Sequence, residues 1–405
     1  MPMNRSLRIL MLTWEYPPMI VGGLSRSVHG LAVHLAELNH EIHVITRSAG
    51  FVPEYEYTDR VHVHRVSVNS AVSREAFAEW VLLMNIGFVQ HTLKLWNNGM
   101  RFHLIHAHDW LVHDSAEEMG EFLGIPIIAT LHATEAGRFF GRLDTDLQKT
   151  IHAKEFRMST AADRIIVCSR AMEAEVNGLF RPPPHKVSVL PNGFDPADLS
   201  FPTRLHRERK LLAAQRTCPD AKVKGIDILY VGRLVHEKGI HNLIEAMPAI
   251  LRMYPQTRLW IVGDGPKREA LIASAQRLAK DRVFFTGRIS DRMRRFLLSA
   301  ADVCVVPSLY EPFGIAALEA MAAGIPVVAS ETGGLPEIVR HNETGLTAAP
   351  GSPQALAEQI LALLNDPEKA QRLTVEAKRE IIEHFNWQSI AEATARLYGE
   401  VLKAQ

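Results

Sequence analysis

Two basic residues five positions apart are placed as the binding of a diphosphate requires. In the stretch 231–239 (VGRLVHEKG), Arg233 stands just past a predicted strand and Lys238 at the start of the next predicted helix. Two cations fixed on one loop can hold a diphosphate and stabilise the negative charge that grows on it as a leaving group. Taken alone, the pair is also compatible with ordinary surface cations.

Two carboxylates with seven residues between them follow in the stretch 310–324 (YEPFGIAALEAMAAG). Glu311 precedes Pro312, which biases it to an extended conformation outside the helix. Glu319 lies inside a helix so rich in apolar residues that a plain solvated acid explains it poorly. We therefore expect Glu319 to bind a polar partner, and a ribose diol is a suitable one.

Two glycine-containing turns precede predicted helices and offer backbone N–H groups to an anion. Phe313, Gly314 and Ile315 open one helix, and Gly22 and Gly23 belong to the turn after the first strand (YPPMIVGGLS). Glycine allows close backbone approach, and the first N–H groups of a helix carry positive potential. A Gly-Gly pair before a helix is, however, often only a turn.

A histidine pair ends another predicted strand, in the stretch 104–111 (LIHAHDWL). His106 and His108 both lie on this strand, and because side chains alternate between its faces, only one of them need face a ligand. We choose His108, which is nearer the strand's carboxyl end. A structural role is the common alternative for such a pair.

Several frequent nucleotide and hydrolase motifs are missing. The chain contains no Gly-Lys dipeptide and therefore no Walker A motif, and it has no G-x-S-x-G elbow. Gly263 and Gly265 begin a dinucleotide fingerprint, but position 268 is Arg. Kinases, NAD-dependent dehydrogenases and serine hydrolases thus lose their main sequence support. Three widely spaced cysteines form neither a metal motif nor a disulfide framework.

The overall charge excludes a dedicated nucleic-acid-binding protein. The 405 residues include 45 Lys plus Arg and 45 Asp plus Glu, so the formal net charge is zero. No stretch of about 20 residues is apolar enough to span a membrane, and no secretory signal is present, so we expect a cytoplasmic protein. An apolar stretch (80–96) and a basic one (204–210) leave peripheral membrane contact open, although a packed helix and a solvated linker explain them better.

Short β-rich runs alternate with helical stretches, which is typical of parallel sheets covered by helices on both faces. The runs form two series, separated by a charged stretch without a strand pattern, Phe201–Lys224. Strands are predicted at Arg8–Thr13, Glu41–Thr46, Val61–Val66, Leu104–Ala107, Ile127–Leu131, Ile165–Cys168 and Val187–Leu190, and then at Asp227–Val231, Arg258–Val262, Val283–Phe285, Val303–Val306 and Pro326–Ala329. Two doubly wound α/β domains follow from this pattern, with their strand ends facing a shared cleft.

Taken together, WEYPPxxxGG, HxHDW, GRLxxEKG and E-x7-E occur in the order and spacing of a known family. The chain resembles the retaining glycosyltransferases of family four and their glycogen-synthase relatives, which have the GT-B fold of two Rossmann-like domains. The resemblance covers essentially the whole chain. It implies an acceptor-side domain at 1–200, a nucleotide-sugar-binding domain at 201–386 and a last helix, at 387–405, that packs back on the first domain.

The resemblance also implies roles for the residues above. Arg233 and Lys238 would bind the donor diphosphate, Glu319 the ribose hydroxyls and Glu311 the donor sugar. Gly23 and the amides of the helix start would contact the phosphates and the sugar, and His108 the sugar near the reacting carbon. No metal ion or other cofactor is expected, because the DTD triplet at 144–146 is better explained as a helix cap.

Two departures distinguish the chain from classical bacterial glycogen synthases. Ile20 stands where they have Lys, and Ala316 where they carry a hydroxyl residue. We expect transfer of a hexose, with glucose as the first choice, from a nucleoside diphosphate to a glycan such as an α-glucan, a lipid or a small molecule. The alternatives are a nucleotide-sugar epimerase or hydrolase on the same fold and a non-catalytic regulator that binds nucleotide sugars.

Overall fold

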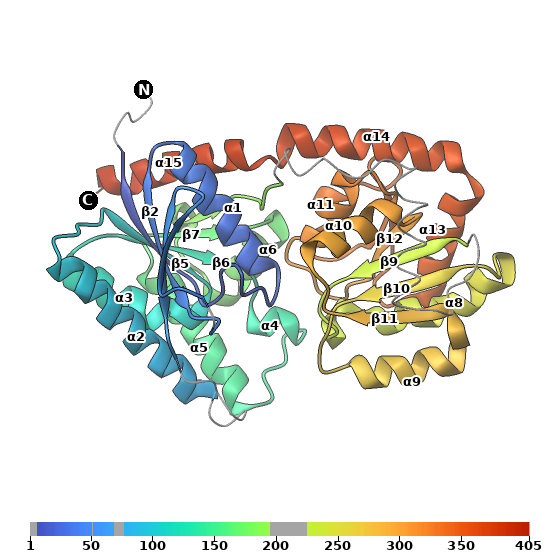
Figure 1. Cartoon of the computed structure of the whole chain (residues 1–405), viewed down its shortest axis with the longest axis horizontal. Coiled ribbons are helices and arrows are strands. Elements are labelled where there is room, and N and C mark those ends of the chain that lie inside the picture. Colours follow the sequence, from blue (N-terminus) through green and yellow to red (C-terminus); the bar gives the residue numbers. More distant parts are fainter. Residues whose placement is uncertain (1–5, 51, 69–76, 195–224, 405) are drawn as a thin grey trace. The chain divides into compact units, whose positions relative to one another are not determined.

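The chain divides into two compact units, each built around its own parallel sheet (Figure 1). The computed structural model describes residues 6–50, 52–68, 77–194 and 225–404. The first unit comprises Met1–Gly193 and Trp387–Gln405, and the second comprises Phe194–Asn386. The linker predicted at Phe201–Lys224 lies outside the described residues.

The first unit has an eight-stranded sheet in the order β3-β4-β2-β1-β5-β6-β7-β8, in which β3 alone is antiparallel to its neighbour. Its strands are β1 (Arg8–Leu12), β2 (Glu41–Arg47), β3 (Tyr55–Thr58), β4 (Val61–Val66), β5 (Leu104–His108), β6 (Ile127–Leu131), β7 (Arg164–Val167) and β8 (Val187–Val189). The strand order reverses between β1 and β5, which places the topological switch point of this sheet there. The sequence did not predict β3, a short edge strand with little burial.

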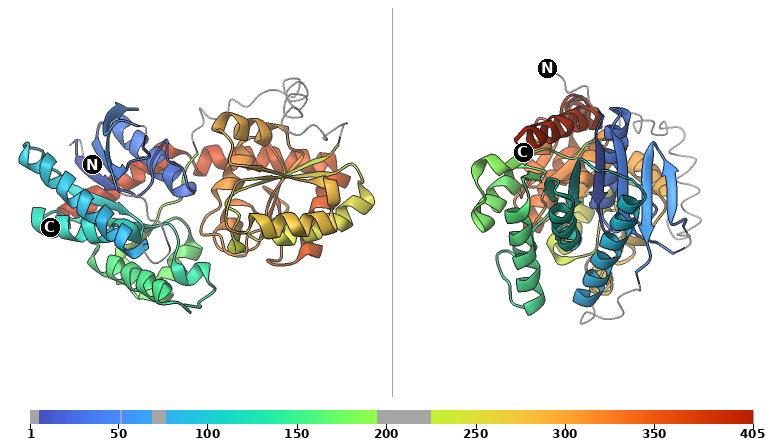
Figure 2. Two further views of the ribbon diagram at one scale, coloured as in Figure 1. Left: turned by 60° about the horizontal axis from the view of Figure 1, so that its bottom comes forward. Right: turned by 90° about the vertical axis from the view of Figure 1, so that its left-hand side faces the viewer.

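Helices cover both faces of this sheet (Figure 2). They are α1 (Gly23–Glu37), α2 (Phe77–Asn97), α3 (His113–Leu123), α4 (Glu135–Arg138), α5 (Asp146–Ala161), α6 (Arg170–Phe180) and α15 (Trp387–Ala404), with 3₁₀ turns η1 (Trp110–Val112) and η2 (Pro184–Lys186). Helices α1 and α15 share one apolar core with the strands. Helix α15 docks closely because Gly30 of α1 has no side chain, and a Cβ there would lie 2.3 Å from the Trp387 ring.

The second unit has a six-stranded, wholly parallel sheet in the order β11-β10-β9-β12-β13-β14. Its strands are β9 (Asp227–Val231), β10 (Arg258–Val262), β11 (Val283–Gly287), β12 (Val303–Val306), β13 (Val327–Ser330) and β14 (Leu346–Ala348). Counted from β9, this is the 3-2-1-4-5-6 order of a Rossmann sheet, with its switch point between β9 and β12. Strand β14 was not predicted, because its sequence, LTA, contains no run of β-branched or large apolar residues.

The helices of the second unit also form two layers around its sheet. They are α8 (Ile240–Met253), α9 (Arg268–Leu278), α10 (Asp291–Ala300), α11 (Ile315–Ala322), α12 (Leu335–Ile338), α13 (Pro353–Asn365) and α14 (Pro367–His384), with 3₁₀ turns η4 (His236–Lys238) and η5 (Lys280–Arg282). The main core lies between the sheet and α8, α9 and α13. In the described part of the chain, no helix is both long and apolar enough to cross a bilayer.

Candidate active site

The residues predicted to do chemistry follow the strands on either side of the two switch points. In the second unit, Arg233 and Lys238 follow β9, and Glu311 follows β12. In the first unit, Gly22 follows β1, and His108 is the last residue of β5. Loops beyond the carboxyl ends of strands at a switch point are where open α/β sheets bind ligands.

The two switch-point loops of the second unit are joined through their backbones. The carbonyl oxygen of Glu237 accepts hydrogen bonds from the N–H groups of Leu309 (2.8 Å) and Tyr310 (3.1 Å). Gly239 has a φ of +62°, and a Cβ there would lie 2.0 Å from the carbonyl oxygen of Pro307. Glycine is therefore required at 239, because any side chain would separate the loop with the cations from the loop with the carboxylate.

Lys238 and Glu311 form an ion pair across these loops. The ammonium Nζ of Lys238 lies 2.7 Å from Oε2 of Glu311, and the hydroxyl of Ser308 donates to the same oxygen at 3.0 Å. Both charged side chains are mostly buried, at 19% and 13% exposure. Among the residues that the structure describes, none donates to the other oxygen of Glu311, Oε1. The pair is thus held in place while Oε1 can accept a hydroxyl.

Arg233 is the more exposed cation of the loop after β9. Its side chain is 41% exposed, and its guanidinium lies 3.6 Å from the carboxylate of Glu237. The backbone of Arg233 is held in place, because the hydroxyl of buried Tyr230 donates to the carbonyl oxygen of Arg233 at 2.9 Å. Burial raises the pKa of Tyr230 well above its usual value, so this hydroxyl stays a donor. Arg233 therefore has a rigid base and an accessible head group.

The loop after β12 leads into helix α11 through Gly314, whose φ is +118°. The N–H groups of Ala317 and Leu318 donate to the carbonyl of Gly314, so the helical hydrogen bonds begin there and the N–H of Ile315 precedes them. The side chain of Phe313 is buried near Phe385, with ring centroids 6.0 Å apart. Phe313 thus anchors the helix start, and the backbone amides beside it are the groups suited to an anion.

Glu319 forms an ion pair with Arg294 of α10, a residue that the sequence did not point to. Both side chains are largely buried, and Arg294 also lies 3.2 Å from Asp291. Nothing in the sequence identifies Arg294 among the neighbouring arginines of the stretch DRMRRF, because only the fold brings α10 beside α11. A buried acid in this apolar helix was expected to need a polar partner, and the structure supplies an arginine.

Gly333 is a second residue that sequence reasoning missed. Its φ is +54°, and a Cβ there would fall 1.9 Å from the carbonyl oxygen of Glu311. The N–H of Gly334 donates to that same carbonyl at 2.9 Å. The two glycines thereby fix the backbone of Glu311 from the loop after β13. The Gly-Gly pair in ETGGLPE is a signal that could have suggested such a close approach.

In the first unit, Glu15 organises the glycine turn. Its carboxylate is buried and accepts hydrogen bonds from the N–H groups of Val21 (2.5 Å) and Gly22 (3.2 Å). The Gly22 N–H, which we expected to face an anion, is therefore used inside the protein. Gly23 begins α1. Burial raises the pKa of Glu15, although these two hydrogen bonds act in the opposite direction.

The histidines of β5 are both buried and have different partners. His106 lies between the hydroxyls of Tyr398 and Thr130, each 2.7 Å away, and so joins α15 to the sheet. His108 has its Nδ1 3.2 Å from Nε2 of His132, which follows β6. The Nε2 of His108 is buried and has no hydrogen-bond partner among the described residues. His132 is partly exposed and was missed, although its stretch LHATEAGR is distinctive.

Two acidic side chains bind backbone N–H groups close in sequence to His132. The backbone N–H of His132 donates to Asp109 at 2.8 Å, and Glu155 of α5 accepts from the backbone N–H of Glu135 at 2.8 Å. Burial raises the pKa of Glu155 to about 8, so this carboxyl is largely protonated at neutral pH. Of these groups, His108 and Asp109 lie at the carboxyl end of β5, beside the switch point, whereas His132 follows β6 and Glu155 belongs to α5.

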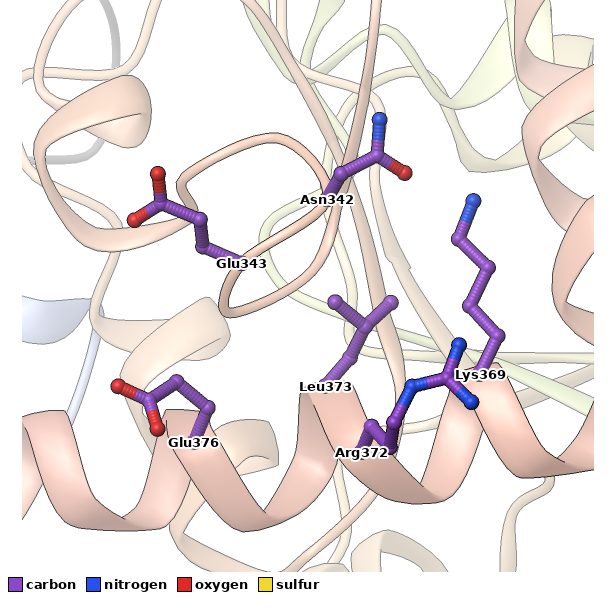
Figure 3. Close-up of a pocket in the computed structure, with 6 residues that line it drawn as sticks. All are labelled: Asn342, Glu343, Lys369, Arg372, Leu373 and Glu376. Carbon is purple, nitrogen blue, oxygen red and sulfur yellow. The ribbon is translucent and has the colours of Figure 1, made fainter.

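A separate hollow of about 480 Å³ lies in the second unit away from these residues (Figure 3). It is lined by residues of α14 and the turn before β14, namely Asn342, Glu343, Lys369, Arg372, Leu373 and Glu376. None of the predicted site residues belongs to it. Its mixture of charges and its lone leucine give it no resemblance to an enclosed ligand site.

Comparison with known proteins agrees with this geometry. The family model described as "Glycosyltransferase Family 4" matches residues 21–198, and the model "Glycosyl transferases group 1" matches residues 215–380. Glycogen synthase of Mycobacterium tuberculosis is 37% identical over 97% of this chain and 94% of its own length. The alpha-maltose-1-phosphate synthase of Mycolicibacterium smegmatis is 28% identical over 98% of this chain and all of its own.

The structural comparison gives the same class. Sucrose-phosphate synthase from Thermosynechococcus elongatus superposes with a TM-score of 0.82, at 28% identity, over 99% of this chain and 100% of its own. The two Rossmann-type sheets and their switch-point loops are thus those of a GT-B glycosyltransferase, as the sequence predicted. The chain belongs to the glycosyltransferases of family four.

Proposed function

We propose that the protein is a retaining glucosyltransferase that moves glucose from a nucleoside diphosphate to an acceptor hydroxyl. The observation that carries the proposal is the cluster of Arg233, Lys238 and Glu311 at the switch point of a Rossmann-ordered sheet. Two cations beside the amides of a helix start match the charge of a diphosphate. Glucose is supported by the relatives, because glycogen, maltose phosphate and sucrose phosphate all contain an α-glucosyl residue.

In this proposal Lys238 serves two partners at once. An ammonium group has three donors, so Lys238 can keep its contact with Glu311 and also donate to a phosphate oxygen. As the bond between the sugar and the diphosphate breaks, negative charge develops on the phosphate oxygens, and Lys238 and Arg233 stabilise it. They act as fixed charges, since Lys238 is held by Glu311 and the backbone of Arg233 by Tyr230.

Glu311 and Glu319 take different parts of the donor. Oε1 of Glu311 is the oxygen available to a hydroxyl of the donor sugar. Glu319 would accept from the ribose hydroxyls, with Arg294 holding its carboxylate in position. Gly23 and the backbone amides of Phe313, Gly314 and Ile315 would contact the phosphates and sugar, and His108 the sugar beside the reacting carbon.

Retention follows from departure and attack on the same face of the sugar. The bond from C1 to the leaving phosphate oxygen breaks, the bond from C1 to the acceptor oxygen forms, and the acceptor proton passes to the leaving diphosphate. No protein nucleophile is needed in this scheme, so the enzyme contributes positioning and charge stabilisation. We propose that it works without a metal ion, because the two cations supply the positive charge.

The test is incubation of the full chain with UDP-, ADP- and GDP-glucose and with either an α-glucan or small sugar phosphates. Mass spectrometry and NMR of the products should show one added glucose in α linkage to the acceptor. Free glucose alone would identify a hydrolase instead, and an epimerised nucleotide sugar would identify an epimerase. Binding of nucleotide sugars without any turnover would favour a regulator and would overturn the proposal.

A further inference from the structure

A second cluster of titratable residues lies in the first unit, at the opposite end of the strands from the switch point. Glu41 is the first residue of β2, and His43 lies two positions further on the same face. His43 pairs in register with His62 of the parallel strand β4. The carboxyl ends of the strands bear the Glu15 and His108 groups, so this cluster is remote from the proposed chemistry along the strand direction.

The side chains of the cluster converge closely. One ligand atom from each of Glu41, His43 and His62 lies within 4.8 Å of the other two. Nε2 of His43 is 3.0 Å from the Glu41 carboxylate, and the rings of His43 and His62 stack with centroids 4.4 Å apart. Among the described residues this is the one group of three or more such side chains with metal-site geometry.

The surrounding residues direct the nitrogens. Tyr55 has its hydroxyl 2.9 Å from Nδ1 of His62, which leaves Nε2 of that ring for a ligand. Arg8 lies 2.7 Å from the carboxylate of Glu41 and fixes its position. Imidazole nitrogens and carboxylate oxygens are ligands that transition-metal ions accept.

From this convergence we infer that Glu41, His43 and His62 form a binding site for a divalent transition-metal ion, with Zn²⁺ as the best match. Zn²⁺ accepts nitrogen and carboxylate ligands in tetrahedral geometry at about 2.0–2.2 Å, which separates the ligand atoms by about 3.3 Å. The ligand atoms, which lie within 4.8 Å of one another, must come closer to reach that geometry. Because the rings of His43 and His62 stack with an interplanar angle of 5°, one ring must also rotate before both nitrogens can point at the ion. Water would take the fourth position.

His64 makes the site feasible without loss of a proton. Nδ1 of His43 lies 3.1 Å from Nε2 of His64. When Nε2 of His43 binds the ion, the ring proton of His43 lies on Nδ1 and is donated to Nε2 of His64, whose own proton then lies on its Nδ1. His91 of α2 lies beside His64, with ring centroids 4.9 Å apart, and has a buried Nε2 with no hydrogen-bond partner among the described residues. Hydrogen bonds among the described residues thus leave one buried ring nitrogen beside the cluster, Nε2 of His91, without a partner.

The experiment uses the full chain, dialysed against EDTA and then freed of chelator, titrated with ZnCl₂ in a calorimeter. We expect one ion per chain with a Kd of about 10 μM or tighter. His62→Ala should weaken binding at least about tenfold, and His62 is partly exposed, so this variant should fold. Co²⁺ should give the intense visible bands of a four-coordinate ion in the wild type but not in His62→Ala.

The matched control is His29→Ala, because His29 also faces a carboxylate, Asp59 at 3.3 Å, but belongs to no group of three. Its Zn²⁺ binding should equal that of the wild type. Glu41→Gln provides the second test, with thermal unfolding in EDTA reporting whether each variant folds. Absence of a stoichiometric ion, or affinity unchanged in both His62→Ala and Glu41→Gln, would identify adventitious binding by surface histidines and overturn the inference.

Discussion

Both units contain a mainly parallel sheet with a switch point, but the side chains beside the two switch points differ in charge. In the second unit these groups are charged and paired: Lys238 with Glu311, and Glu319 with Arg294. In the first unit His108 is neutral, because burial lowers its pKa well below the usual value, and Asp109, the acid that follows it, accepts the backbone N–H of His132. One scaffold thus carries two ion pairs in one unit and mainly buried histidines in the other.

This difference indicates a division of labour. Fixed charges stabilise a diphosphate that becomes more negative during the reaction, and paired charges need little reorganisation to do so. Neutral donors and acceptors suit sugar hydroxyls, whose charge hardly changes. If the division is correct, substitutions in the second unit should act mainly on the departure of the diphosphate.

The largest effect is expected from removing either cation. Lys238→Ala and Arg233→Ala should each lower turnover by at least about 100-fold at saturating donor, because each removes a charge that matters most as the diphosphate leaves. Lys369→Ala, which alters a cation of the unrelated hollow in Figure 3, should leave turnover unchanged. Steady-state kinetics decides, and near wild-type turnover in either cation variant would contradict the leaving-group role.

The two carboxylates should differ in which kinetic constant they change. Glu311→Ala should mainly lower kcat, since its sugar contact tightens as the ring flattens, whereas Glu319→Ala should mainly raise the KM for donor. A hydrogen bond to a charged group is worth roughly 1.5–3 kcal/mol, so each effect should be about ten- to a hundredfold. Arg294→Ala should resemble Glu319→Ala. The reverse assignment of kcat and KM effects would exchange the two roles.

A smaller effect should come from the glycine that fixes Glu311. Gly333→Ala introduces a Cβ against the carbonyl of Glu311 and should lower kcat about tenfold, because it displaces the carboxylate. Gly351→Ala is the matched control: its φ is +74°, but the nearest atom to a new Cβ is a Leu309 methyl 3.6 Å away. Both substitutions place a side chain at a residue with positive φ and therefore introduce similar backbone strain. Only a lower kcat in Gly333→Ala than in Gly351→Ala supports a positioning role for Gly333.

These residues also show how far the sequence could predict the site. The motifs predict roles for Arg233, Lys238, Glu311 and Glu319, because each follows a recognisable strand or lies in an apolar helix, and these roles remain predictions. The partner Arg294 could not be found, since its role depends on α10 packing beside α11 and not on any local pattern. Gly263 and Gly265 were interpreted only as an incomplete dinucleotide-binding motif.

The structure explains those glycines by backbone contacts. A Cβ on Gly263 would lie 1.9 Å from the carbonyl oxygen of Gly232, and one on Gly265 would lie 2.5 Å from that of Leu234. They let the loop after β10 pack against the loop that carries Arg233. Most of the parallel strands were predictable from their apolar runs, but β3 and β14 were not, because their sequences, YEYT and LTA, contain no such run.

The first unit should also be the more sensitive to acid. Burial lowers the pKa of His106 to about 3, and the pKa values of its neighbours His108 and His132 are lowered as well. The unfolded chain binds protons near pH 6.5 and the folded unit does not, so the stability present above pH 6.5 declines as the pH falls towards 3. Glu155 acts oppositely between about pH 8 and 4.5, and Glu15, whose pKa is also raised, acts in the same sense as Glu155. The histidines with lowered pKa outnumber these two acids in the first unit.

In the second unit, His241 is the one described histidine whose pKa is lowered. Hydrogen exchange of EDTA-treated protein between pH 7 and 4 should therefore show peptides of β5 and β6 losing protection before those of β9 and β12. The expected difference is modest and should shrink in His106→Gln, which cannot take up the proton. Simultaneous loss of protection in both units would show that these histidines do not govern acid unfolding.

The smallest expected effect is that of a chelator, which should leave kcat unchanged. We expect Arg233 and Lys238 to supply the positive charge at the proposed diphosphate site, so that no Mg²⁺ or Mn²⁺ ion is needed there. The acidic triplet 144–146 of the first unit is not arranged as a metal site, because exposed Asp144 and Asp146 pair with Arg142 and Lys149 and flank the helix cap Thr145.

Removal of Zn²⁺ from the Glu41 cluster should lower the melting temperature of the first unit but should not change turnover measured well below that temperature. Initial rates with and without EDTA test this, and a complete loss of activity that Mg²⁺ or Mn²⁺ restores would show that the donor is bound through a metal after all.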